Sequence, residues 1–326
     1  MNFPYLLRLM CLCSASFFLV NAAVGLGTLL FSRVAVRYAE TRRASIAARF
    51  LFTLRMAPFA FGLLIVLGLC IPSYLRFEPE AITERIGLLC SALGLLGAAS
   101  WTISIARATR ALSASWRYTR QCELAARETN ALEGSSQVFV VEGEAPLLAM
   151  AGLVRPRLLV SRGVMYALSA EELDSALRHE TAHRVSRDNF KRLAILLAPD
   201  IFPFVRGLRA LERSWMKFAE WAADDEAVGG DSRRALWLAG ALLCVARMGV
   251  GPRLSFLHTS LVARGDELAT RVERLLHMRA SVPRRGWRPR PLVVSAGLLL
   301  ASYLVLLMAW PATLSSIHRL LELFLR

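Results

Sequence analysis

The sequence has few histidines, more basic than acidic residues and no cysteine pattern typical of a metal site. Its six cysteines, at positions 11, 13, 70, 90, 122 and 244, lack the paired spacings of zinc-binding modules, so cysteine ligands are not expected. The net charge is +15, but no DNA- or RNA-reading motif is present, so direct nucleic-acid binding is not expected either. Histidine occurs only five times in 326 residues, so a close pair of histidines is informative.

The apolar content is high for a chain in which 20% of the residues are charged. Hydrophobic residues make up 55% of the sequence and the mean hydropathy is +0.44, which indicates a membrane protein with polar segments. Nearly all of the positive charge is arginine, and much of it flanks apolar runs, as the positive-inside rule predicts for cytoplasmic loops. We therefore expect the lipid bilayer, rather than nucleic acid, to be a partner of this chain.

Three apolar runs within residues 1–105 are long enough to cross a hydrocarbon core of ~30 Å as helices. The first could also be a signal peptide, although it is longer than the usual apolar region of one. Arginines between the first two runs predict a basic cytoplasmic loop at 32–55, which places the N-terminus outside. Glycine and alanine in the second and third runs allow close helix packing. The three predicted spans are Leu9–Phe31, Ala57–Leu75 and Ile86–Ile105.

A fourth span is predicted at 291–311, followed by a short external tail at 312–326 that is expected to form an amphipathic helix. Residues 106–290 between the third and fourth spans should then form a cytoplasmic domain, which begins with a helix over 106–132. Two β-branched and aromatic runs, Gln137–Val141 and Leu158–Val160, predict strands in this domain, with a turn or hairpin over 146–152.

Two apolar runs of this domain, Leu193–Val205 and Ala235–Ala246, are too short to span a bilayer. The simpler interpretation is that both form helices buried in the core of the domain. The alternative is a site at the membrane surface, with one of these runs entering the lipid interface.

Residues His179-Glu180-Thr181-Ala182-His183 match H-E-x-x-H, the zinc-binding helix signature. A capping box formed by Ser169 and Glu172 predicts a helix that starts there and contains both histidines. Positions four apart lie on one face of a helix, where two imidazoles can bind a single Zn²⁺. Glu180 follows the first ligand and is the expected catalytic general base, because it can reach a water molecule at the metal.

A catalytic zinc ion needs a third protein ligand. Glu220 and Asp224 lie four residues apart on a predicted helix from about Leu208 to Val228, so their carboxylates share one face. One of them could bind zinc while the other accepts the free N–H of a ligand histidine and fixes its tautomer. The spacing alone does not decide which carboxylate is the ligand. His318 lies beyond the fourth predicted span, on the opposite side of the membrane.

These motifs resemble those of the BlaR/MecR-type membrane zinc metallopeptidases, which release antibiotic-resistance repressors, and more distantly those of HtpX-like proteases. The resemblance implies a mostly α polytopic membrane protein of the bacterial cytoplasmic membrane, with a zincin-like (gluzincin) α+β domain between spans three and four. It also implies that Glu220 is the third ligand of one Zn²⁺ per chain and that Asp224 is the partner of a ligand histidine. It covers about residues 135–280 and rests on PLLAMAGLVRPRLLV (146–160), LSAEELDSALRHETAH (168–183), Arg187–Asn189, EWAAD (220–224) and RVERLL (271–276).

The sequence therefore predicts a membrane-embedded zinc endopeptidase that cleaves a cytoplasmic or membrane-proximal protein. A transcriptional repressor in a signalling pathway is the first substrate expected from the resemblance, and quality control of membrane proteins is the alternative. A non-catalytic zinc-stabilised receptor or scaffold is a further alternative, in which His258 or Asp224 would be a fourth ligand. One of the two predicted strands is expected to be an edge strand that aligns the substrate. A homo-oligomer is compatible with the sequence.

Overall fold

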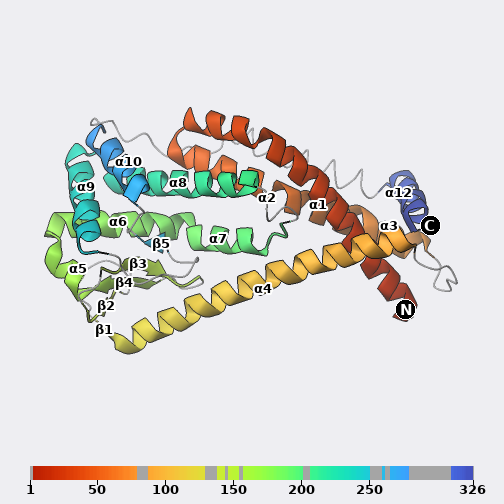
Figure 1. Cartoon of the computed structure of the whole chain (residues 1–326), viewed down its shortest axis with the longest axis horizontal. Helices are drawn as coiled ribbons and strands as arrows, with labels where there is room; N and C mark the ends of the chain where they lie inside the picture. Colours follow the sequence, from red (N-terminus) through yellow and green to blue (C-terminus); the bar gives the residue numbers. More distant parts are fainter. Residues whose placement is uncertain are drawn as a thin grey trace.

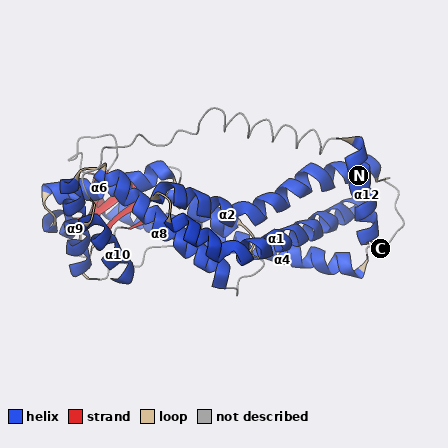
Figure 2. Cartoon of the chain, turned by 90° about the horizontal axis from the view of Figure 1, so that it is seen from above, coloured by secondary structure: helices blue, strands red, loops and turns tan. Residues whose placement is uncertain are grey.

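Long helices form one end of the molecule and a small sheet covered by shorter helices forms the other (Figure 1). Figure 2 shows that helices make up almost all of the chain that is described and that the strands gather at one end. The computed structural model describes residues 3–78, 87–128, 138–143, 146–153, 157–200, 206–249, 259–260, 265–278 and 310–325.

Three helices are long and apolar enough to cross a membrane, as the sequence predicted for residues 1–105. They are α1 (Phe3–Glu40), α2 (Ala44–Ile65) with its continuation, and α4 (Leu88–Ala125). Helix α2 passes through a π-helical turn, η1 (Val66–Cys70), into α3 (Ile71–Phe77). The predicted fourth span at 291–311 lies outside the described residues except for its last two positions. The chain is therefore described as a mostly helical membrane protein with three candidate spans.

Glycines of α4 allow this helix to pack closely against α1. A Cβ atom at Gly94 would lie 2.7 Å from Cys11 Sγ, and one at Gly97 would lie 2.4 Å from the Ser14 carbonyl oxygen. The Ser14 hydroxyl donates a hydrogen bond of 2.8 Å to the Gly94 carbonyl, so the helices are also linked by a polar contact. Small residues in the third predicted span thus do allow close packing, and these two glycines pack against the first span.

The segment predicted as a basic cytoplasmic loop at 32–55 is almost entirely helical, so the prediction of a loop is corrected, whereas its cytoplasmic placement stays a prediction. Residues 32–40 continue α1 and residues 44–55 begin α2, and only the turn at 41–43 separates the two helices. The physical reason lies in the alanines of this stretch, which favour helix and form one buried face. That face packs against Trp215 and Phe218 of α8 (Arg206–Val228), so helix packing stabilises this arginine-rich segment. The buried residues of this face are Ala39, Ala44, Ala47, Ala48 and Leu51.

The sheet has the strand order β1-β2-β4-β3-β5, in which β2 and β4 are parallel and the other pairs are antiparallel. Both predicted strands are confirmed, as β2 (Val138–Val141) and β4 (Arg157–Ser161). The stretch predicted as a turn or hairpin contains a strand, β3 (Leu148–Ala151), in which Leu148, Ala149 and Met150 are almost fully buried and thus favour a strand inside the core. The helix predicted over 106–132 ends at Ala125, where β1 (Ala126–Glu128) begins; the fifth strand is β5 (Thr259–Ser260).

The main core of the domain lies between β3, β4 and three helices, α6 (Ala170–Ser186), α9 (Ser232–Arg247) and α10 (Gly265–Leu276). Helix α9 contains the apolar run 235–246, and its apolar face is buried in this core, as the simpler interpretation predicted. The domain also contains the short helix α5 (Arg162–Ala167). The predicted tail forms helix α12 (Pro311–Leu325), which lies at the same end of the molecule as the start of α1 (Figure 1).

The other apolar run, Leu193–Val205, packs against the long helices in its described part rather than in the main core of the domain. Its described part belongs to α7 (Asp188–Leu197) and to the residues that follow, and it lies against the long helices. Leu193 packs on Ala108 of α4, and Asn21 of α1 donates a hydrogen bond of 3.0 Å to the carbonyl oxygen of Pro199. Residues 201–205 are outside the described chain. Helix α7 therefore joins the domain to the apolar helices.

Candidate metal centre

Helix α6 begins at the predicted capping box and carries both histidines. The Ser169 hydroxyl accepts a hydrogen bond from the Glu172 amide, and the Glu172 carboxylate accepts one from the Ser169 amide. The helix ends at Arg187, which adopts a left-handed conformation (φ 54°) and turns the chain directly into α7. His179 and His183 lie well inside the helix and are buried, with 0% and 3% of their surface exposed.

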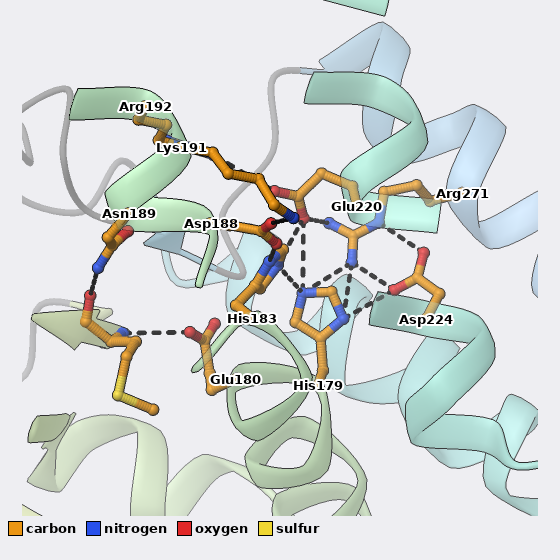
Figure 3. Close-up of polar contacts among 11 residues, drawn as sticks. His179, Glu180, His183, Asp188, Asn189, Lys191, Arg192, Glu220, Asp224 and Arg271 are labelled. Atoms are coloured by element: carbon orange, nitrogen blue, oxygen red, sulfur yellow. Dashed lines mark hydrogen bonds and ion pairs between the residues drawn. The ribbon is translucent and has the colours of Figure 1, made fainter. Parts of the chain in front are cut away.

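The imidazoles of α6 and the carboxylate of Glu220 on α8 converge on one point (Figure 3). His179 Nε2 lies 3.1 Å from His183 Nε2, and Glu220 Oε2 lies 3.5 Å from each of these nitrogens. Ligand atoms of a tetrahedral zinc site with bonds near 2.05 Å are separated by about 3.3 Å. The three predicted ligands therefore lie together at spacings that suit one metal ion. Among the described residues, no other group of three or more such side chains could hold a metal.

The donor set fits zinc in its chemistry as well as its spacing. Two imidazoles and one carboxylate are ligands that Zn²⁺ commonly takes, and three protein ligands leave a fourth position open. The buried Glu220 Oε2 has no hydrogen bond of good geometry in the described structure, although Arg271 Nη1 lies 3.2 Å away, so this oxygen keeps a lone pair for a cation.

Each histidine is held by a carboxylate on the nitrogen that faces away from the ligand position. His179 Nδ1 lies 2.9 Å from Asp224 Oδ1, and His183 Nδ1 lies 2.7 Å from Asp188 Oδ2. A proton on Nδ1 satisfies each of these contacts and leaves the lone pair of Nε2 for a metal. Asp224 thus occupies the place expected for a partner of a ligand histidine, whereas sequence reasoning gave Asp188 no role.

The carboxylates raise the pKa values of both imidazoles in the metal-free chain. Burial alone would lower the pKa of His183, but Glu220 and the hydrogen bond with Asp188 outweigh burial and raise this pKa to about 10. For His179, burial again lowers the pKa, but the contacts with Asp224 and Glu220 outweigh burial and raise it. In the absence of metal, the site therefore favours protonation of His183 at neutral pH and shifts the pKa of His179 in the same direction.

The same contacts keep the acidic partners ionised. Burial would raise the pKa of Asp224, but Arg271 and His179 reverse this effect and lower the pKa to about 2. Burial likewise opposes ionisation of Glu220, whose pKa is held well below its usual range, first of all by His183. Both carboxylates are therefore negatively charged across the physiological range, as a metal ligand and its supporting acid need to be.

Glu180 differs from these acids because burial dominates its titration. Its pKa is raised, since it is fully buried, and the neighbouring histidines offset this only in part. Its Oε2 accepts a hydrogen bond of 3.1 Å from the Met150 amide of β3, whereas Oε1 has no hydrogen-bond partner in the described structure. A carboxylate with a raised pKa and a free oxygen is suited to accept and return a proton near neutral pH.

Strand β3 is the strand that contacts this site. Besides the bond from the Met150 amide to Glu180, the Asn189 side chain donates hydrogen bonds of 3.2 Å to the carbonyl oxygens of Met150 and Gly152. The sequence-based expectation that β2 or β4 forms the edge strand is wrong, because both lie inside the sheet with neighbours on either side. The pattern of apolar residues identified strands but carried no information on their order.

Arg271 of α10 is a further residue of the site to which the sequence assigned no role. It is 2% exposed and lies beside Asp224, Glu220 and His179 (Figure 3). A signal for it exists in the sequence, since Arg271 shares the apolar face of its helix with Leu268 and Leu275. A charged residue on a buried face needs a partner of opposite charge.

In comparisons with known proteins, no protein-family model and no curated protein matches this chain. The interpretation of the site therefore rests on its geometry and on the motifs of the sequence.

Proposed function

We propose that this chain is a membrane-anchored zinc-dependent endopeptidase. The observation that carries the proposal is the convergence of His179, His183 and Glu220 on one point, beside a fully buried Glu180 with an unpaired oxygen. A structural zinc site would need only ligands, whereas the buried acid next to them adds a group that can move a proton. The proposal agrees with the H-E-x-x-H and E-x-x-x-D motifs and with the resemblance that they support.

The contacts of each residue support its proposed role in peptide hydrolysis. A zinc ion bound by these three residues would supply Lewis-acid chemistry, which lowers the pKa of a water molecule and polarises a peptide carbonyl. Glu180 would accept a proton from the attacking water molecule on Oε1 and return it to the leaving amine, while the Met150 amide fixes Oε2. Asp224 and Asp188 hold the two imidazoles in the tautomer that presents Nε2.

The substrate we propose is a cytoplasmic or membrane-proximal protein. Helix α7 follows α6 directly and packs against α4, and Pro199 just beyond α7 accepts a hydrogen bond from Asn21 of α1, which supports a site close to the apolar helices. By resemblance to the BlaR/MecR-type peptidases, a transcriptional repressor is the first candidate and the role is signal transduction. Membrane-protein quality control, as for HtpX-like proteases, is the other candidate class of substrate.

A closed structural zinc site is less well supported. It would need a fourth protein ligand from the chain. Asp224, one of the two candidates for this ligand, is already engaged by His179 Nδ1 and by two nitrogens of Arg271. The other candidate, His258, lies outside the described residues. X-ray absorption of the zinc-loaded chain tests this alternative, because four protein ligands and no water would favour it.

The variant Glu180→Gln tests the proposal. It should retain one zinc per chain and lose peptidase activity, since an amide cannot accept the proton. The matched control is Glu171→Gln, which changes an exposed glutamate of the same helix and should keep both properties. Purified chain in detergent is incubated with a mixed peptide library, and new termini are read by mass spectrometry. Retained cleavage by Glu180→Gln would remove Glu180 from the mechanism.

Cells that carry Glu180→Gln also separate the two substrate classes. Proteins that accumulate uncleaved in these cells, relative to cells with the unchanged chain, are identified by quantitative mass spectrometry. A single accumulated repressor supports signalling, whereas many membrane proteins support quality control.

A further inference from the structure

We propose that Arg271 is a positioning residue for the metal site, which fixes Asp224 and Glu220 in the arrangement that metal binding requires. The inference rests on the proposed metal site and names a residue beyond its ligands. Arg271 Nη2 and Nε lie 2.6 and 2.9 Å from the two oxygens of Asp224, and Nη1 lies 3.2 Å from Glu220 Oε2. One guanidinium therefore contacts both carboxylates of the E-x-x-x-D motif.

The charge of the site explains why a cation is needed at this position. Glu220 and Asp224 lie on successive turns of α8 and are both ionised, so they repel each other in a setting with little water. The forked guanidinium can bind one carboxylate through two nitrogens and still reach a second carboxylate with the third. A lysine ammonium is a single point of charge and cannot hold both groups in this way.

The contacts also distinguish a positioning role from simple competition with the metal. Arg271 makes its two shortest contacts with Asp224, which faces His179 Nδ1 rather than the ligand position. Its contact with Glu220 Oε2 is longer, and a carboxylate oxygen has two lone pairs, so this oxygen can face Arg271 and a metal ion at once. Arg271 Nη2 also lies 3.4 Å from His179 Nε2, so the guanidinium restricts the orientation of this ring.

A second arginine of the same helix provides a matched comparison. Arg274 joins α10 to α8 as Arg271 does, by an ion pair with Asp225 and by contacts with the carbonyl group and the ring of Trp221. In the described structure it forms no hydrogen bond or ion pair with His179, His183 or Glu220. Loss of Arg274 should therefore weaken the packing of α10 on α8 without altering the ligands.

The test measures metal affinity and metal geometry in the full chain in detergent. The metal-free protein is titrated with Zn²⁺ in competition with a chromophoric chelator, and with Co²⁺ to record its visible absorption bands. Arg271→Gln should lower the zinc affinity about 10- to 100-fold, as expected when a partner of a ligand is removed. Arg271→Lys keeps the charge and should give a smaller loss together with a changed Co²⁺ spectrum. Arg274→Gln should change neither quantity.

Several outcomes would overturn the inference. An unchanged zinc affinity in Arg271→Gln would assign Arg271 to helix packing alone, and a higher affinity would show that it competes with the metal. If Arg271→Gln does not fold, Arg271→Lys provides the test. A zinc affinity and a Co²⁺ spectrum equal to those of the unchanged chain would show that a guanidinium contacting both carboxylates is not required. Absence of zinc binding by the unchanged chain would instead refute the metal site itself, so the two failures are distinguishable.

Discussion

Zinc binding should release protons, and its affinity should rise steeply with pH. Both imidazoles have raised pKa values in the metal-free chain, that of His183 being about 10, because carboxylates surround them. A metal binds only the neutral imidazole, so the protons must leave when zinc enters. At pH 7 we expect at least one proton to be released for each zinc ion bound.

The pKa of His183 sets the size of this effect. For each proton released from a group with a pKa of about 10, the apparent affinity rises about tenfold per pH unit at lower pH. Between pH 6.5 and pH 8.5 the increase is therefore about 100-fold for one proton. The metal-free chain should show the opposite trend in stability. Because the pKa is raised above 6.5, protonation stabilises this fold below pH 6.5, and the stabilisation is lost as the pH rises through about 10.

Calorimetry of zinc binding in two buffers of different ionisation enthalpy counts the protons at pH 7. The variant Asp188→Asn removes one of the carboxylates that raise the pKa of His183, so it should release fewer protons and show a shallower pH dependence. Its control is Asp174→Asn, which removes an exposed carboxylate of α6 paired with Arg178. An affinity that stays constant from pH 6.5 to pH 8.5, with no proton released at pH 7, would refute this reasoning.

Two further predictions concern the third ligand and the helix packing. Glu220→Gln should lower the zinc affinity at least about 100-fold, measured by dialysis and metal analysis, because it removes the charged ligand oxygen; an unchanged metal content would exclude Glu220 as a ligand. Gly97→Ala should destabilise the chain by about 1–3 kcal/mol in thermal unfolding in detergent, because its Cβ would lie 2.4 Å from the Ser14 carbonyl oxygen. The control is Gly27→Ala, because a Cβ atom at Gly27 would have no atom within 4 Å, so the melting temperature of this variant should not fall. An equal fall in melting temperature in both variants would contradict the close packing of α1 and α4.

Local signals in the sequence predicted the elements that carry the site. The capping box at Ser169 predicted the start of α6, and the predicted end of α8 at Val228 is confirmed, with Gly229 and Gly230 adopting positive φ directly after it. These signals act within a few residues, so a single sequence contains them in full. The spacing of four residues likewise placed His179 with His183, and Glu220 with Asp224, on shared helix faces.

Contacts between distant elements could not be read in the same way. Asp188 reaches His183 because Arg187 turns the chain between α6 and α7, and arginine rarely adopts the left-handed conformation that this turn requires. Arg271 reaches Asp224 only because α10 packs across α8. The arginines of 32–55 led to the prediction of a loop, although this segment is helical. The positive-inside rule predicts on which side of the membrane a segment lies and does not predict its backbone conformation.

The arrangement of the candidate ligands makes the proposed metal site dependent on the long apolar helices. Two ligands come from α6, which is anchored in the core of the domain, and the third comes from α8. Helix α8 packs along α2, where Trp215 contacts Phe52 and the buried Arg55 forms an ion pair of 2.7 Å with Glu212. Since Glu220 lies on the same helix, two turns beyond Glu212, its distance from the histidines depends on how α8 sits on α2. The contact between α8 and α2 therefore both packs an apolar helix that can cross a membrane and holds Glu220 near the two histidines.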